Sequence, residues 1–197
     1  LLIQTSDGLF NEVNNLAFSH DSQFEYVDAA VFDFDQDGDM DIYVMSGGNE
    51  YVDGDPNLMD RLYINNGNAV FNKFPANLPS TNGGSISSAD FNNDGYSDLA
   101  ISQPHIDTWT SSDDSINSPT GTLNGKVEVY HGSLNGISIT PNLTYYGEQD
   151  YQKMGQGLTV GDFNGDSFSD LVVGSPGFNQ EDGKIDVYFG SPSGLAS

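Results

Sequence analysis

Short apolar runs recur along the chain in pairs, and a polar segment separates the two members of each pair. Most runs are rich in Val, Ile, Leu and aromatic residues, which is typical of β-strands. A helix would instead place apolar residues every three or four positions, and no helix is predicted. The predicted strand pairs are Val27–Phe32 with Ile42–Met45, Ser85–Ala89 with Leu99–Ser102, and Gly157–Val160 with Leu171–Gly174.

Two outer strands are predicted after each of the first two pairs, joined by turns rich in Asn and Gly. They are Arg61–Ile64 with Ala69–Phe71, and Lys126–Tyr130 with Ile137–Ile139. Asn-Gly turns between apolar runs indicate hairpins. Four strands per unit, repeated along the chain, predict an all-β fold built from β-propeller blades of four antiparallel strands.

The repeat also predicts the domain organisation. Residues 1–197 are interpreted as part of one β-propeller domain of about three blades. Residues 1–26 form the end of a preceding blade, 27–80 and 81–150 form two blades, and 151–197 form an incomplete blade. Because three blades leave open sheet edges, the chain is expected to be a fragment of a larger propeller.

An acidic motif lies between the strands of each pair. It reads Asp-Phe-Asp/Asn-x-Asp-Gly/Ser-x-x-Asp and occupies the loops 33–41, 90–98 and 162–170. All three copies have Phe at the second position and an aliphatic residue at the tenth. Such agreement argues against three unrelated solvated loops and for a shared structural purpose.

Oxygen atoms at this spacing suit a hard cation, and about three Ca²⁺ ions are predicted. Ca²⁺ takes six to eight oxygens from carboxylates, amides and backbone carbonyls. Side chains at positions 1, 3, 5 and 9 and the carbonyl at position 7 are the expected ligands. They are Asp33, Asp35, Asp37, Asp39 and Asp41; Asp90, Asn92, Asp94, Tyr96 and Asp98; and Asp162, Asn164, Asp166, Phe168 and Asp170.

The sixth position of the loop should adopt positive φ. Gly38 and Gly95 suit that conformation, whereas Ser167 in the third loop should cost on the order of 1 kcal/mol. An EF-hand is excluded because its loop ends in Glu at position 12, where this chain has Val44, Ile101 and Val173. Strands rather than helices flank each loop.

The composition of the chain excludes several classes of function. The chain has 29 acidic and 5 basic side chains, a net charge of −24, and no Cys. This charge excludes nucleic-acid binding and disfavours an anionic membrane surface, and no apolar run is long enough for direct membrane insertion. The three His lie in unrelated contexts, and no nucleophile elbow, phosphate loop or zinc motif occurs, so this segment is not expected to be an enzyme.

The third unit closely resembles the FG-GAP repeats of integrin α-subunits and of related bacterial and eukaryotic surface proteins. The resemblance lies in Gly161–Asp166, in Leu171–Pro176 at the Gly-Ala-Pro position, and in Gly183–Gly190. The second unit has Ser102-Gln103-Pro104 and the first has Ser46-Gly47-Gly48 at that position. The resemblance implies a seven-bladed propeller with calcium between the first two strands of a blade. It also implies that partners dock on the opposite face.

Two long loops fall on that predicted partner face, at residues 47–60 and 103–124. Candidate contacts to a protein or glycan ligand are Tyr51, Asp53, His105, Asp107 and Trp109, and a disordered polar excursion is the alternative. Phe34, Phe91 and Phe163 are predicted to pack between blades. Asn142 begins an Asn-Leu-Thr sequon, which permits N-glycosylation in a eukaryotic host.

The sequence therefore favours a calcium-binding propeller of an extracellular or cell-surface protein that acts in adhesion or ligand binding. One alternative is the propeller portion of a carbohydrate-processing or phospholipase-type enzyme. The other is an architectural subunit of a surface filament or assembly. The remaining blades of the same chain are also expected partners.

Overall fold

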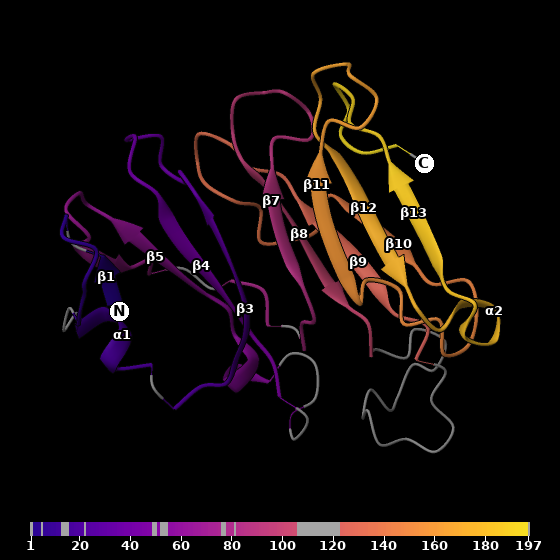
Figure 1. Ribbon diagram of the computed structural model, residues 1–197, viewed down its shortest axis with the longest axis horizontal. Helices are drawn as coiled ribbons and strands as arrows, with labels where there is room; N and C mark the ends of the chain where they lie inside the picture. The colour runs from indigo at the N-terminus through magenta and orange to yellow at the C-terminus, as the bar shows by residue number, and fades with distance from the viewer. Residues whose placement is uncertain are drawn as a thin grey trace.

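Four antiparallel sheets follow one another along the chain in the computed structural model (Figure 1), which describes residues 2–4, 6–12, 16–21, 23–48, 51, 55–75, 78–80, 82–105 and 123–196. A hairpin comes first, formed by β1 (Leu2–Gln4) and β2 (Phe10–Glu12). The second sheet contains β3 (Tyr26–Phe32), β4 (Asp41–Ser46), β5 (Arg61–Asn65) and β6 (Phe71–Lys73). The third contains β7 (Ile86–Ala89), β8 (Asp98–Gln103), β9 (Lys126–Tyr130) and β10 (Leu143–Tyr146). The fourth contains β11 (Gly157–Gly161), β12 (Asp170–Ser175) and β13 (Lys184–Tyr188).

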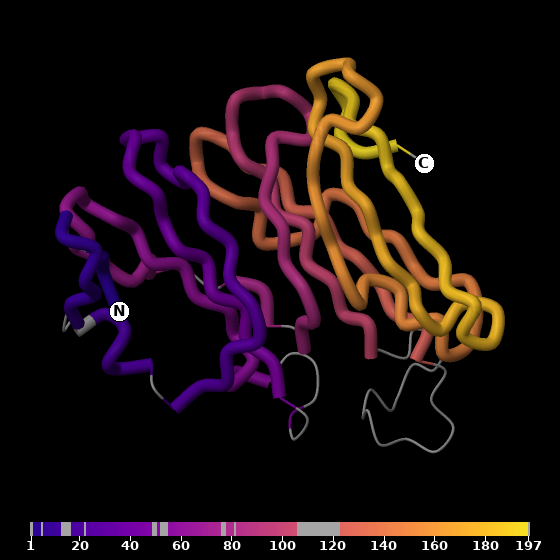
Figure 2. Tube along the Cα trace, viewed as in Figure 1, coloured from indigo at the N-terminus to yellow at the C-terminus, as the bar shows by residue number. Residues whose placement is uncertain are grey.

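The three larger sheets stand side by side, as propeller blades do. In each sheet, strands pair in the order in which they occur along the chain. The first strands contact one another, β3 with β7 and β7 with β11, and so form the inner side of the array. The two chain ends lie at opposite sides of the row of sheets (Figure 2). This arrangement confirms the predicted all-β fold of four-stranded blades.

Hydrophobic cores fill the space between neighbouring sheets. Strand β8 shows how alternation serves two cores at once, because successive side chains of a strand point to opposite faces. Leu99 and Ile101 pack with Tyr43 and Met45 of the preceding sheet. Ala100, between them, packs with the following sheet. The central sheet is thus buried on both faces.

Within the described residues, three short helical segments depart from the prediction of no helix. They are α1 (Leu16–Ser19), the 3₁₀ turn η1 (Pro56–Leu58) and α2 (Phe178–Glu181). The turn η1 is started by Asp55, whose side chain accepts a hydrogen bond from the backbone N–H of Asn57. None of the helices in the described residues is long and apolar enough to cross a membrane.

The predicted outer strand at Ile137–Ile139 is wrong. The outer strand of that sheet is β10, which pairs with β9 from Leu143 to Tyr146. Both segments alternate apolar and polar residues, but only β10 buries an aromatic ring against the next sheet, because Tyr145 stacks on Tyr188 with ring centroids 4.2 Å apart. Pattern alone could not separate the two candidates.

The repeated Phe of the loops occupies three environments. Phe91 is fully buried between the second and third of the larger sheets, and Phe34 packs partly buried between the first and second. Phe163 is 55% exposed. The prediction that these rings pack between blades is confirmed for Phe34 and Phe91 and wrong for Phe163, because no following sheet of the described residues covers its ring.

Candidate metal centre

The three acidic loops lie along one edge of the molecule. Each connects the first and second strands of its sheet, β3 to β4, β7 to β8, and β11 to β12. Figure 1 shows the three hairpins turning at the same upper edge. The sequence predicted this placement because each acidic loop lies between two strand-like runs.

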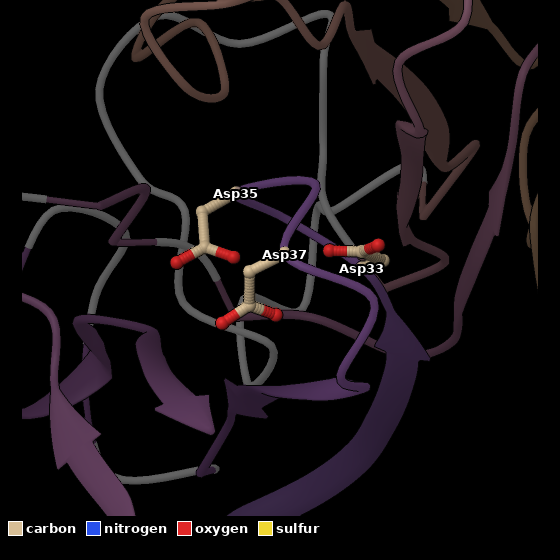
Figure 3. Close-up of side chains that lie close together, drawn as sticks. All are labelled: Asp33, Asp35 and Asp37. Atoms are coloured by element: carbon tan, nitrogen blue, oxygen red, sulfur yellow. The ribbon is translucent and has the colours of Figure 1, made fainter. Parts of the chain in front are cut away.

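In the first loop, three carboxylates converge on one point (Figure 3). One oxygen from each of Asp33, Asp35 and Asp37 lies within 4.8 Å of the others. Oδ2 of Asp33 accepts a hydrogen bond from Gly38 N at 3.1 Å, but its buried Oδ1 has no hydrogen-bond partner. An unpartnered buried carboxylate oxygen is costly, so this donor set fits a hard cation such as Ca²⁺.

Backbone conformation explains the glycines of the motif. The sixth position has positive φ in every loop, with 93° at Gly38, 90° at Gly95 and 74° at Ser167. This confirms the predicted turn and places Ser167 in a strained conformation. The fourth position also has positive φ, which the motif did not predict: 60° at Gln36, 56° at Asn93 and 79° at Gly165. The third loop therefore has its glycine at the fourth position rather than the sixth.

The second and third loops differ from the first by an Asn at the third position. Asn92 donates from Nδ2 to Oδ2 of Asp94 at 3.0 Å, and Asn164 does the same to Asp166 at 2.9 Å. The side chain of Asp35 has no N–H group and cannot make this bond. In the second and third loops a side-chain hydrogen bond thus joins the third and fifth positions, whereas the first loop has two carboxylates at these positions.

The ninth residue of each loop joins three segments of its sheet. Its Oδ2 accepts from the backbone N–H of the loop's second residue, and its Oδ1 accepts from a backbone N–H just at or beyond the end of the third strand. The bonds run from Phe34 and Asn65 to Asp41, from Phe91 and Gly132 to Asp98, and from Phe163 and Gly190 to Asp170. Each carboxylate oxygen keeps a second lone pair, so a cation ligand at this position is compatible with these bonds.

Burial shapes the electrostatics of these ninth-position residues. Burial raises the pKa of Asp98 to about 6, against the opposing effect of its hydrogen bonds from Gly132 and Phe91. Burial also raises the pKa of Asp41. In contrast, the backbone N–H of Ser167 lowers the pKa of exposed Asp162. Burial thus disfavours the charged form of Asp41 and Asp98, whereas backbone hydrogen bonds favour the charged form of Asp162.

Two of the predicted partner residues, Tyr51 and His105, lie in the β4–β5 and β8–β9 connections, which leave the sheets at the opposite edge. Tyr51 is half-buried and His105 is exposed. Asp53, Asp107 and Trp109 lie outside the described residues. Asn142 is exposed, and its Oδ1 accepts a hydrogen bond from His131 N at 2.8 Å.

A buried polar network at this opposite edge of the first large sheet was not predicted. Arg61 is 1% exposed, and its guanidinium lies over the ring of Phe24 at 3.4 Å from the centroid. Asp21 accepts from Lys73 Nζ and from Tyr63 Oη, both at 2.8 Å, and its Oδ1 lies 3.8 Å from Arg61 Nε. A sequence signal existed, because Arg61 is one of only five basic residues and begins an apolar strand.

Asp60 lies next to this network. Its two oxygens accept hydrogen bonds from Ser46 N at 2.9 Å and from Tyr43 Oη at 2.8 Å. Burial raises the pKa of Asp60 to about 8. The carboxyl group is therefore largely protonated at neutral pH and carries little of the chain's negative charge.

Four-stranded antiparallel sheets that stand side by side, with acidic hairpin loops along one edge, define a β-propeller built of repeated blades. The FG-GAP repeat family model matches residues 82–106 and 154–188. These matches, together with the likeness to integrin alpha subunits over most of the chain, support an FG-GAP, integrin α-type family of propeller repeats.

Three relatives illustrate the relationship. Phosphatidylinositol-glycan-specific phospholipase D of Homo sapiens is 36% identical over 115 residues, which cover 56% of this chain and 12% of that protein. Integrin alpha-6 of Homo sapiens is 32% identical over 162 residues, covering 78% of this chain and 12% of the integrin. Integrin alpha-5 of Xenopus laevis is 26% identical over 190 residues, covering 94% and 17%. The chain thus spans a small part of each relative.

Proposed function

We propose that the three hairpin loops bind Ca²⁺ and that the ions stabilise the blades of a propeller acting in adhesion or in binding a protein or glycan ligand. The observation that carries the calcium assignment is the convergence of Asp33, Asp35 and Asp37 around the unpartnered Oδ1 of Asp33. The same loop backbone recurs twice, with positive φ at the fourth and sixth positions. A cation offsets the repulsion between carboxylates that otherwise opposes this packing.

The expected affinity is weak, with Kd about 10⁻⁴ to 10⁻³ M as in extracellular calcium modules. Such sites would be filled outside a cell and mostly empty in a cytosol. This supports an extracellular or cell-surface location. The likeness to integrin alpha subunits supports the adhesion proposal, and the ligand would bind at the edge opposite the calcium loops.

Thermal unfolding with and without Ca²⁺ tests the calcium assignment. At about 10 mM free Ca²⁺, each filled loop should add about 1.4 to 2.7 kcal/mol for Kd values of 10⁻³ to 10⁻⁴ M. EDTA should therefore lower Tm by several degrees, and excess Ca²⁺ should restore it. A Tm that changes neither with EDTA nor with Ca²⁺ would overturn the assignment.

Calorimetric titration assigns the ions to individual loops. Asp94→Ala and Asp166→Ala should each remove or weaken one of about three sites. Glu148→Gln is a suitable control because Glu148 is an exposed carboxylate outside the loops. An unchanged stoichiometry in both loop variants would show that other groups bind the ion.

The likeness to phosphatidylinositol-glycan-specific phospholipase D favours one alternative, a propeller that accompanies a catalytic domain in a larger enzyme. Protein and glycan arrays probed with the calcium-loaded propeller separate the two proposals. Specific capture of a ligand supports the adhesion proposal. Absence of capture on both arrays contradicts it.

A further inference from the structure

A hydrogen bond links the first two acidic loops. Nε2 of Gln36, at the fourth position of the loop 33–41, donates to the backbone carbonyl oxygen of Gly95 at 2.5 Å. Gly95 is the sixth residue of the loop 90–98. Gln36 lies between Asp35 and Asp37, so its backbone position depends directly on how those two carboxylates are held.

The acceptor is part of the second loop's own ligand framework. The peptide group that supplies the Gly95 carbonyl also supplies the N–H of Tyr96, which donates to Oδ1 of Asp94 at 2.9 Å. The N–H of Gly95 itself donates to Oδ2 of Asp90 at 2.9 Å. The bond from Gln36 therefore orients a peptide group that in turn positions the expected ligands at the fifth and seventh positions.

Packing supplies a second tie between the first loop and the second of the larger sheets. The ring of Phe34 lies close to Gly136, where an added Cβ would come within 2.7 Å of Phe34 Cζ. Gly136 belongs to the connection between β9 and β10. The first loop is thus held against its neighbour on both sides of Asp35, through Phe34 and Gln36.

The second and third loops offer a contrast within the same molecule. Asn93 occupies the fourth position of the second loop, with a φ of 56° close to the 60° of Gln36. Its side chain is one methylene shorter and is exposed. Among the described residues, no hydrogen bond joins the side chain of Asn93 to the loop 162–170. In the part of the chain that the structure describes, a side-chain hydrogen bond of the fourth residue therefore joins the first pair of adjacent loops and not the second pair.

We propose that Gln36 couples the first two calcium loops, so that an ion in the loop 33–41 increases the affinity of the loop 90–98 for its own ion. This inference rests on the proposed calcium binding. An ion held by Asp35 and Asp37 fixes the backbone on both sides of Gln36 and so favours its bond to Gly95. By linkage, the second ion strengthens binding of the first by the same factor.

Terbium luminescence excited through tyrosine gives a reading specific to the second loop. Tb³⁺ replaces Ca²⁺ at oxygen sites, and Tyr96 supplies a tyrosine sensitiser at the seventh position of the loop 90–98, where the other two loops carry Asp39 and Phe168. Tyr96→Phe should abolish this signal and so verifies the assignment. Competition by Ca²⁺ then gives the calcium affinity of the second loop.

Gln36→Ala should weaken the second loop about threefold to tenfold, as expected for the loss of one hydrogen bond. Gln36→Gly is the control for backbone strain, since glycine adopts positive φ without cost and also removes the amide; it should weaken the second loop as much as Gln36→Ala does. Asp33→Ala, which disables the first loop, should weaken the second loop by a similar factor. In the double variant Asp33→Ala, Gln36→Ala, the two losses should not add.

The outcomes separate the coupling from calcium binding itself. Equal affinities of the second loop in Gln36→Ala and in the unaltered protein would overturn the coupling and leave calcium binding intact. Weakening by Gln36→Ala but not by Gln36→Gly would also overturn it, by assigning the loss to backbone strain. Absence of tyrosine-sensitised Tb³⁺ binding in the unaltered protein would overturn both proposals.

Discussion

Acidic side chains gather at both ends of the sheet β3–β6, but different groups compensate their negative charge at the two ends. At the loop end, Asp35 and Asp37 are exposed and lie together with Asp33. At the opposite end, Asp21 is buried against Arg61, Lys73 and Tyr63, and Asp60 is buried with a raised pKa. Under the proposed calcium binding, the loop end depends on a cation from solution, whereas the buried end depends on the protein's own cations and on protonation. The two ends should therefore respond to different variables, calcium concentration and pH.

The largest expected effect is at the buried end. Asp21→Ala removes the carboxylate beside Arg61 and leaves a buried guanidinium without its counter-charge, so we expect a loss of about 3 kcal/mol in the free energy of unfolding. Urea denaturation in saturating Ca²⁺ and again in EDTA measures it, and the loss should be the same in both. Lys73→Ala is the control, because Lys73 is 42% exposed and its removal should cost less than about 1 kcal/mol. A loss for Asp21→Ala below that of Lys73→Ala would break the comparison.

The next effect is the pH dependence set by Asp60. Its pKa is about 8 in the folded state and near 3.8 when unfolded, so the folded state binds the extra proton between these values. The stabilisation is complete below pH 4 and declines as the pH rises towards 8, by at most about 1.4 kcal/mol per pH unit. Asp60→Asn cannot titrate and should flatten this slope.

Urea denaturation in EDTA at pH 5, 6, 7 and 8 measures the slope without interference from calcium binding. Glu148→Gln should keep the slope of the unaltered protein. If Asp60→Asn has that same slope, the buried end does not respond to pH through Asp60, and the contrast with the loop end fails.

The smallest effect is at the loop end. Asp35→Asn removes one of three clustered charges and adds an N–H able to donate to Asp37, as Asn92 and Asn164 do to their neighbours. In EDTA we expect the stability to rise by about 0.5 kcal/mol, and in Ca²⁺ to fall because a carboxylate ligand is lost. Paired thermal unfolding scans measure both changes. Asn164→Asp in the third loop should show the reverse signs, and a change of one sign in both solutions would refute the cation dependence.

Local sequence patterns predicted much of the fold because the strand pairs and the acidic loops repeat along the chain. The strand pairs, the hairpin position of the acidic loops and the positive φ at Gly38 follow from spacing and from the freedom of glycine. The outer strand at Ile137–Ile139 was wrong because two alternating segments compete, and only the aromatic contact of Tyr145 with Tyr188 decides between them.

Interactions between distant residues could not be predicted. Asp21 meets Arg61 and Tyr63 across 40 and 42 positions, and Gln36 meets Gly95 across 59. Such pairs leave no periodic signal in one sequence. The exposure of Phe163 likewise depends on what packs beside its sheet, which the loop motif does not encode.

The hydrogen bonds of the ninth loop residue have a mechanical consequence. Asp98 ties the start of its loop and the chain just beyond β9 to the first residue of β8, and Asp41 and Asp170 do the same in their sheets. A pulling force applied to one acidic loop is therefore shared among three chain segments rather than unzipping one hairpin from its tip. These aspartates should therefore make the loop edge of each sheet resistant to tension.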